Sequence, residues 1–258
     1  MVGGRPLRPR ERTLILATLL ALAAAAWVVV IAQATMAGEM AMGAGSPTMG
    51  LAAPLFLAVW IAMMVAMMFP TAAPMILTFA AIAAGKRQRG QPHAPTWVFV
   101  GAYLLVWSLF GGVAYGLALA LERLAMMSPW VMDHLGQIGG AVLILAGLYQ
   151  LSPLKHACLA QCRTPMQFVL TSWRDGRGGA FRMGLAHGVY CLGCCWLLFL
   201  ILFPLGVMNI AAMAALTALI FAEKALPAGR RVGQVAAAVL IAYGLLVLVF
   251  PAALPTAM

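Results

Sequence analysis

Three cysteines within a run of five residues form the densest group of reactive side chains in this sequence. They are Cys191, Cys194 and Cys195, and His187 lies one helical turn before the first of them. Helix residues three and four positions apart are neighbours, so these four side chains share a stripe of roughly 100°. Thiolates and imidazoles grouped in this way hold soft ions such as Cu(I) or Zn(II). The spacing therefore predicts a soft-metal site.

A second pair of thiols, Cys158 and Cys162, is spaced i, i+4 in a short polar segment. We expect this segment to be a cytoplasmic loop, in which Lys155 and Arg163 would lower the pKa of both thiols. His156 is a candidate accessory ligand. Because the expected compartment is reducing, metal binding is favoured over a structural disulfide. The sequence leaves open whether the two cysteine groups form one site.

Methionines supply further soft ligands. Met63, Met64 and Met67 share one face of an apolar helix, and thioethers suit Cu(I) but bind Zn(II) poorly. Core packing is the alternative, because methionine is a common apolar filler. For Glu223 the alternative to a metal role is an interfacial ion pair with Lys224. The accessory candidates lie in a loop over residues 34–50 and on one face of a later helix: Met36, Met40, Met42, Asn209, Met213 and Glu223.

The composition requires that these residues be positioned by membrane helices. The chain has 258 residues, of which 64% are hydrophobic and 9% charged, and its mean hydropathy is +1.00. Soluble domains average roughly 25% charged residues. In lipid every backbone amide must be satisfied within its own segment, which favours helices. The sequence therefore predicts one all-α membrane domain, a polytopic transmembrane helical bundle over residues 1–258 that contacts the lipid bilayer.

Seven segments are long and apolar enough to cross a bilayer, which needs about 20 residues each. We expect Pro70 and Pro74 to kink the second of them. The first segment follows a basic tail over residues 1–13 and is either a retained signal anchor, which we favour, or a cleaved signal sequence. The remaining six make up a helical core over residues 51–250. The expected spans cover residues 14–33, 51–84, 96–121, 135–151, 183–203, 209–225 and 232–250.

The distribution of charge predicts the orientation of the chain. Fifteen of the 16 lysines and arginines fall on one side of this arrangement, with Arg123 as the exception. The positive-inside rule then places the N-terminus in the cytoplasm and the C-terminus outside. The formal charge of +10 is therefore a topology signal and does not indicate nucleic-acid binding. We expect a multi-pass protein of the bacterial inner (plasma) membrane.

Several stretches carry a resemblance to a known family: Trp60–Pro74, Tyr149–Pro165, Gly188–Trp196, Phe203–Met213 and Glu223–Lys224. On these stretches the chain resembles a bacterial family of predicted metal-binding integral membrane proteins. The family has been carried as a domain of unknown function, and some members are labelled copper chaperones. The resemblance covers most of the chain from the second span onward. It implies metal binding at these positions without identifying a reaction.

The leading hypothesis is a non-enzymatic membrane protein that binds Cu(I) for transport or for delivery to a metallochaperone or cuproenzyme. Its methionines would pass the ion to the thiols around Cys191. One alternative is a membrane thiol oxidoreductase, because Cys191 and Cys194 have the spacing of a redox pair. A second alternative is a non-catalytic assembly subunit with a structural zinc site, since thiolates suit zinc as well.

Overall fold

The computed structural model describes residues 8–39 and 46–255, and every regular element in this part of the chain is helical. The prediction of an all-α fold is therefore confirmed. The elements are α1 (Pro9–Glu39), α2 (Ala53–Gln88), α3 (Thr96–Met127), α4 (Pro129–Asp133), α5 (Leu135–Gln150), α6 (Pro153–Arg163), α7 (Pro165–Ser172), α8 (Gly176–Leu200), α9 (Leu202–Leu205), α10 (Ile210–Ala225), α11 (Gly229–Val249) and the 3-10 helix η1 (Pro251–Ala253).

A helix occupies each of the seven predicted positions, but not all of them are long enough to span a bilayer alone. Five stretches of the described chain qualify by length and composition: α1, α2, α3, α8 with α9, and α11. A sixth is obtained if α5 and α6, which meet at a bend of 62°, count as one span. Helix α10 has 16 residues, so it is about 24 Å long against a hydrocarbon core of about 30 Å. The structure thus supports five or six candidate spans.

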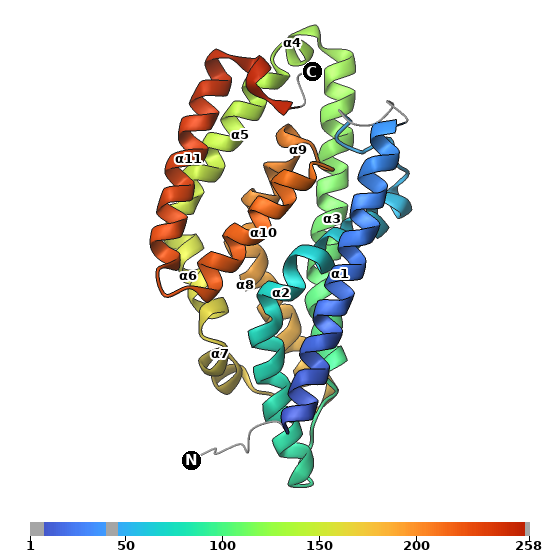
Figure 1. Ribbon diagram of the computed structural model, residues 1–258, viewed down its shortest axis with the longest axis vertical. Coiled ribbons are helices and arrows are strands. Elements are labelled where there is room, and N and C mark those ends of the chain that lie inside the picture. Colours follow the sequence, from blue (N-terminus) through green and yellow to red (C-terminus); the bar gives the residue numbers. More distant parts are fainter. Residues whose placement is uncertain (1–7, 40–45, 256–258) are drawn as a thin grey trace.

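The long helices α1, α3, α5 and α11 run roughly along the long axis of the molecule, and α10 runs obliquely to it (Figure 1). Helices α1, α2 and α3 form one side, while α5 and α11 pair along the opposite side. Helices α8 and α10 run between them, and α8 packs closely on α3. Helix α2 continues through Pro70 and Pro74 without a break, and its path in Figure 1 changes direction partway.

Glycines allow two helix pairs to approach closely. On α5, a β-carbon at Gly140 would lie 2.9 Å from the carbonyl oxygen of Gly244 on α11. On α8, a β-carbon at Gly184 would overlap the carbonyl oxygen of Phe99 and lie 2.8 Å from the β-carbon of Ala102 on α3. Small residues at such contacts are typical of membrane helix pairs, which gain stability from close packing. The close contact between α3 and α8 sets the position of the α8 thiols along α3.

Replacing Gly184 with alanine should therefore destabilise the protein by about 1–3 kcal/mol, because backbone atoms of α3 cannot move aside as a flexible side chain can. Unfolding by denaturant in micelles, followed by circular dichroism, would measure the loss. Gly178→Ala is the matched control on the same helix, because a β-carbon there meets nothing within 4 Å. Equal unfolding free energies for the two variants would contradict the close-packing argument.

Large apolar side chains cover much of the outer surface. On α3 and α11 the side chains of Leu109, Val113, Val235 and Val239 are exposed. Apolar residues are normally confined to small surface patches in soluble proteins. Together with the apolar spans, this surface is compatible with a membrane protein.

Charged residues at the end of α2 hold the start of α8 in place. The ammonium group of Lys86 donates a hydrogen bond to Asp175, the residue before α8, and lies 5.1 Å from the ring centroid of Trp173. Hydrogen bonds from Lys86 and from the Trp173 indole lower the pKa of the Asp175 carboxyl below its usual value. The carboxylate therefore keeps its charge at neutral pH, where the contact joins α2 to the α7–α8 connection.

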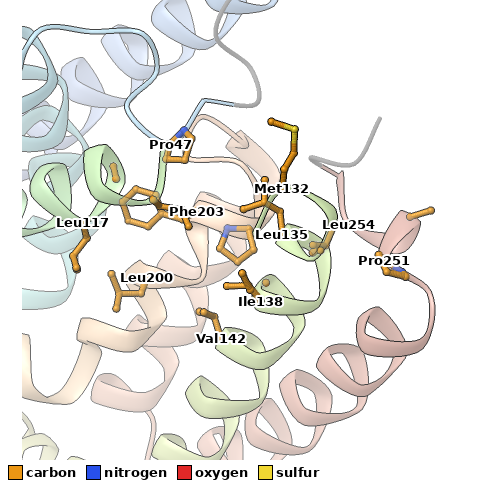
Figure 2. A pocket seen from close by; sticks show the side chains of 16 residues that line it. Pro47, Leu117, Met132, Leu135, Ile138, Val142, Leu200, Phe203, Pro251 and Leu254 are labelled. Carbon is orange, nitrogen blue, oxygen red and sulfur yellow. The ribbon is translucent and has the colours of Figure 1, made fainter. Parts of the chain in front are cut away.

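An apolar cavity of about 570 Å³ lies beside α4, whose Met132 is among its lining side chains (Figure 2). It is bounded by residues of α3, α5 and α9 and by the 3-10 helix, with Leu117, Ile138, Phe203 and Leu254 among its lining side chains. Its lining contains no cysteine or histidine. The cavity is therefore separate from the predicted soft-metal ligands.

Candidate metal site

The three α8 cysteines face the interior of the bundle, as their helical spacing predicts. Cys191, Cys194 and Cys195 are at most 1% exposed. The sulfur atoms of Cys194 and Cys195 are 3.2 Å apart, and the Cys194 thiol donates to the carbonyl oxygen of Cys191 at 3.1 Å. A single helix therefore brings three thiols together out of contact with solvent.

The segment carrying Cys158 and Cys162 is a helix, so the prediction of a loop is wrong. Helix α6 begins after Ser152, whose side chain accepts a hydrogen bond from the backbone of Lys155, and it turns by 62° relative to α5. This turn lays α6 against α8. The polar residues that suggested a loop are instead those of an N-capped helix with a proline in its first turn.

Only one of the two α6 cysteines joins the α8 thiols. The Cys162 thiol lies close enough to those of Cys191 and Cys194 to interact with them electrostatically. Cys158 lies instead against the backbone of α8, where a β-carbon at Gly193 would be 2.8 Å from its sulfur. We call Cys162, Cys191, Cys194 and Cys195 the thiol cluster. Its four sulfur atoms come from two helices.

The sulfur of Cys191 has two further partners that the sequence analysis did not assign to it. The ammonium nitrogen of Lys224, on α10, lies 3.1 Å from this sulfur and 3.5 Å from the hydroxyl oxygen of Thr71. The hydroxyl of Tyr103, on α3, lies 3.2 Å from the same sulfur. A lysine within an apolar helix is itself a signal of function, which could have identified Lys224. No comparable sequence signal marks Tyr103.

Lys155 lies apart from the thiols, so the prediction that it lowers their pKa is wrong. Its ammonium donates to Glu223 at 2.7 Å and to the side-chain oxygen of Gln150. The Gln150 amide donates to the second carboxylate oxygen of Glu223 at 2.9 Å. We call these three buried residues the polar network; it joins α5, α6 and α10. Arg163 donates to the carbonyl oxygen of Leu226 at 2.8 Å, in the α10–α11 connection.

The predicted alternative for Glu223, an ion pair with Lys224, is also wrong. Consecutive residues of a helix point about 100° apart, so neighbours in sequence face different surroundings. Glu223 therefore faces Lys155 and α5, whereas Lys224 faces α8 and the thiol cluster. The end of α10 therefore contacts both the polar network and the thiol cluster.

His187 is buried one turn before Cys191, and neither of its ring nitrogens has a hydrogen-bond partner among the described residues. The imidazole is stacked on Tyr103 and Phe99, with ring centroids 5.3 and 5.8 Å away. Buried polar atoms are nearly always hydrogen-bonded, so two free nitrogens on one side chain require an explanation. They leave His187 available as a ligand.

The α2 methionines are core residues. Met63, Met64 and Met67 are fully buried and belong to the same apolar core as the α8 thiols. Met68, which the sequence analysis did not select, contacts Thr71. Its sulfur lies 3.9 Å from the hydroxyl oxygen of Thr71, which in turn approaches Lys224. Thr71 therefore connects α2 to the thiol cluster.

The accessory candidates are dispersed. Asn209 is the N-cap of α10, where its side chain accepts from Ala212 and donates to Leu205, both at 3.0 Å. His156 shares a 2.7 Å hydrogen bond with the carbonyl oxygen of Ser152. Met213 is fully buried in the core, whereas Met36 is exposed on α1. Met40 and Met42 lie outside the described residues. Metal binding by these side chains stays a prediction.

A family model named PpoB2 and described as a copper chaperone matches residues 57–247. This chain belongs to the PpoB2 copper chaperone family. The matched range holds all five cysteines together with Lys224, and it confirms the resemblance inferred from the sequence. No curated protein and no solved structure gives a significant match.

The donor set of this PpoB2 family member suits a soft ion. Thiols and an imidazole with free nitrogens are soft or borderline ligands, and carboxylates are absent from the thiol cluster. Within the described part of the chain, no three histidine, cysteine or acidic side chains are arranged to hold one ion together. The cluster therefore offers donors of suitable chemistry, while a site of three or more ligands would need side chains to reorient.

Proposed function

We propose that this protein is a membrane carrier that binds Cu(I) through the thiol cluster and delivers it to a cuproprotein. The observation that carries the proposal is the convergence of Cys162, a partly exposed residue of α6, with the three buried thiols of α8, Cys191, Cys194 and Cys195. Membership of a copper chaperone family supports copper as the ion. Soft thiolate ligands favour Cu(I) on chemical grounds.

The proposed path of the ion runs from methionines to thiolates. The N-terminus would lie on the cytoplasmic side of the inner membrane, as the distribution of basic residues favours. Met36 and the neighbouring loop would capture Cu(I) outside, and the α2 methionines would pass it inward. The shared core of Met67 and Cys194 supports this path, as does the contact between Met68 and Thr71. Thiolates bind Cu(I) more tightly than thioethers, so transfer in this direction is favourable.

The proposal is tested by titrating the purified full-length chain with Cu(I) under anaerobic conditions in detergent micelles. A chromogenic Cu(I) chelator competes with the protein, so the loss of its colour reports the affinity. We expect stoichiometric binding that survives competition. Only trace copper on folded protein would overturn the proposal.

Among single variants, Cys162→Ser should weaken binding and Cys158→Ser should not. Both residues are cysteines on α6, but only Cys162 contacts the other thiols. Loss of a residue that merely supports a ligand costs about 10- to 100-fold in metal affinity, so loss of Cys162 should cost at least as much. The chelator competition measures both variants. Equal affinities for the two would exclude Cys162 from the binding site.

A further inference from the structure

Lys224 is a cation that has no acidic partner among the residues described by the structure. Its ammonium nitrogen contacts the sulfur of Cys191 and the hydroxyl of Thr71. The ion pairs of the described residues use Lys86, Arg87 and Lys155, and none of them includes Lys224. The adjacent carboxylate, that of Glu223, is bound by Lys155. Lys224, which is partly buried, therefore faces sulfur where such a lysine would ordinarily face a carboxylate.

An ammonium group in apolar surroundings is costly unless a negative charge compensates it. The hydroxyl of Thr71 is neutral, so of the two contacts of Lys224 only the thiol of Cys191 can supply that charge. Each thiol that becomes a metal ligand loses its proton to solvent and gains one negative charge. The net charge of the metal–thiolate complex therefore decides whether the ammonium of Lys224 is compensated.

The charge balance favours one kind of ion. Two thiolates around Cu(I) carry a net charge of −1, which the ammonium of Lys224 neutralises. Two thiolates around a divalent ion carry no net charge, which leaves the ammonium uncompensated. No three candidate ligands of the described chain are arranged around one point, so the charge balance is considered for a pair of thiolates. The neutral assembly is the one that a low-dielectric interior tolerates best.

We infer that Lys224 is a specificity-determining residue that favours a monovalent soft cation held by two thiolates over a divalent ion. The inference rests on the proposed function, because it concerns the ion bound at the same cluster. Lys224 acts here as a fixed positive charge beside the ligand sulfur of Cys191. Helix α10 thus positions the charge that determines which ion is preferred.

The test compares Lys224→Met and Lys224→Arg with wild type, using the full chain in micelles. Cu(I) affinity is measured by chelator competition and Zn(II) affinity with a zinc indicator. The methionine variant should lose about 10- to 100-fold in Cu(I) affinity, the usual cost of removing a partner of a ligand. Its Zn(II) affinity should change less, so the ratio of Cu(I) affinity to Zn(II) affinity should fall. The arginine variant, which keeps the charge, should retain most of the preference.

Lys86→Met is the matched control, because it removes a lysine that pairs with Asp175 away from the thiols. If Lys224→Met does not fold, Lys224→Gln replaces it with a neutral side chain that can still donate to sulfur. A folded neutral variant with the wild-type Cu(I)-to-Zn(II) ratio would overturn the inference while leaving the proposed function intact. Absence of Cu(I) binding by wild type would instead overturn the proposed function itself.

Discussion

Lys155→Met is expected to lower the free energy of unfolding by about 3–5 kcal/mol, the usual cost of breaking a buried ion pair by removing one partner. Lys155 and Glu223 are 2% and 1% exposed, so the carboxylate left behind cannot reach water. Its one remaining hydrogen-bond partner in the described part of the chain would be the Gln150 amide. Denaturant unfolding of the micellar protein, followed by circular dichroism, measures the effect.

A double variant, Lys155→Met with Glu223→Met, separates the ion pair from simple loss of packing. Removing both charges abolishes the uncompensated carboxylate, so the double variant should be more stable than Lys155→Met alone. Gln150 would then lack both partners, which should keep the double variant below wild type. Arg163→Met is the control for loss of a basic residue on α6, because that side chain is partly exposed and donates to a backbone carbonyl. A Lys155→Met variant as stable as Arg163→Met would show that the polar network contributes little.

The helices of this protein follow from local properties of the sequence. Apolar runs in lipid must be helical, so the positions of α1, α2 and α3 could be predicted from hydropathy. The inward-facing stripe of Cys191, Cys194 and Cys195 could be predicted as well, because it depends only on 3.6 residues per turn. Helix α6 could not, since its mixed composition suggests a loop unless the cap at Ser152 is recognised.

Contacts between helices were beyond the reach of the sequence. The i, i+4 spacing of Cys158 and Cys162 places both on one face of α6, yet the angle between α6 and α8 decides which sulfur meets Cys191. In the same way, the adjacency of Glu223 and Lys224 suggested an ion pair, whereas packing against α6 and α8 gives each residue a separate partner. Such pairings depend on the relative placement of three helices, which no spacing along one of them encodes.

Replacing Cys191, Cys194 and Cys195 together with serine is expected to abolish Cu(I) binding. Serine oxygen is a hard ligand that does not replace thiolate for Cu(I), and the variant leaves Cys162 as the single cysteine of the thiol cluster. Chelator competition on the anaerobic, micellar protein measures the loss. Circular dichroism establishes that the variant is folded, since three hydroxyls in a buried position carry a cost of their own.

The same variant distinguishes the three hypotheses for the thiols. If the protein is a copper carrier, the triple variant loses Cu(I) binding and the wild-type protein shows no thiol–disulfide exchange activity. A structural zinc protein would contain stoichiometric zinc as purified and would lose stability, in addition to the metal, in the variant. A thiol oxidoreductase would reduce a disulfide substrate in wild type, and Cys191 with Cys194, or the 3.2 Å pair of Cys194 and Cys195, would be oxidised to a disulfide in the exchange. If the triple variant folds and binds Cu(I) as tightly as wild type, the thiol cluster is excluded as the copper site. Cys162 is the one thiol of the cluster left in that variant, and a single thiol would not hold the ion with wild-type affinity.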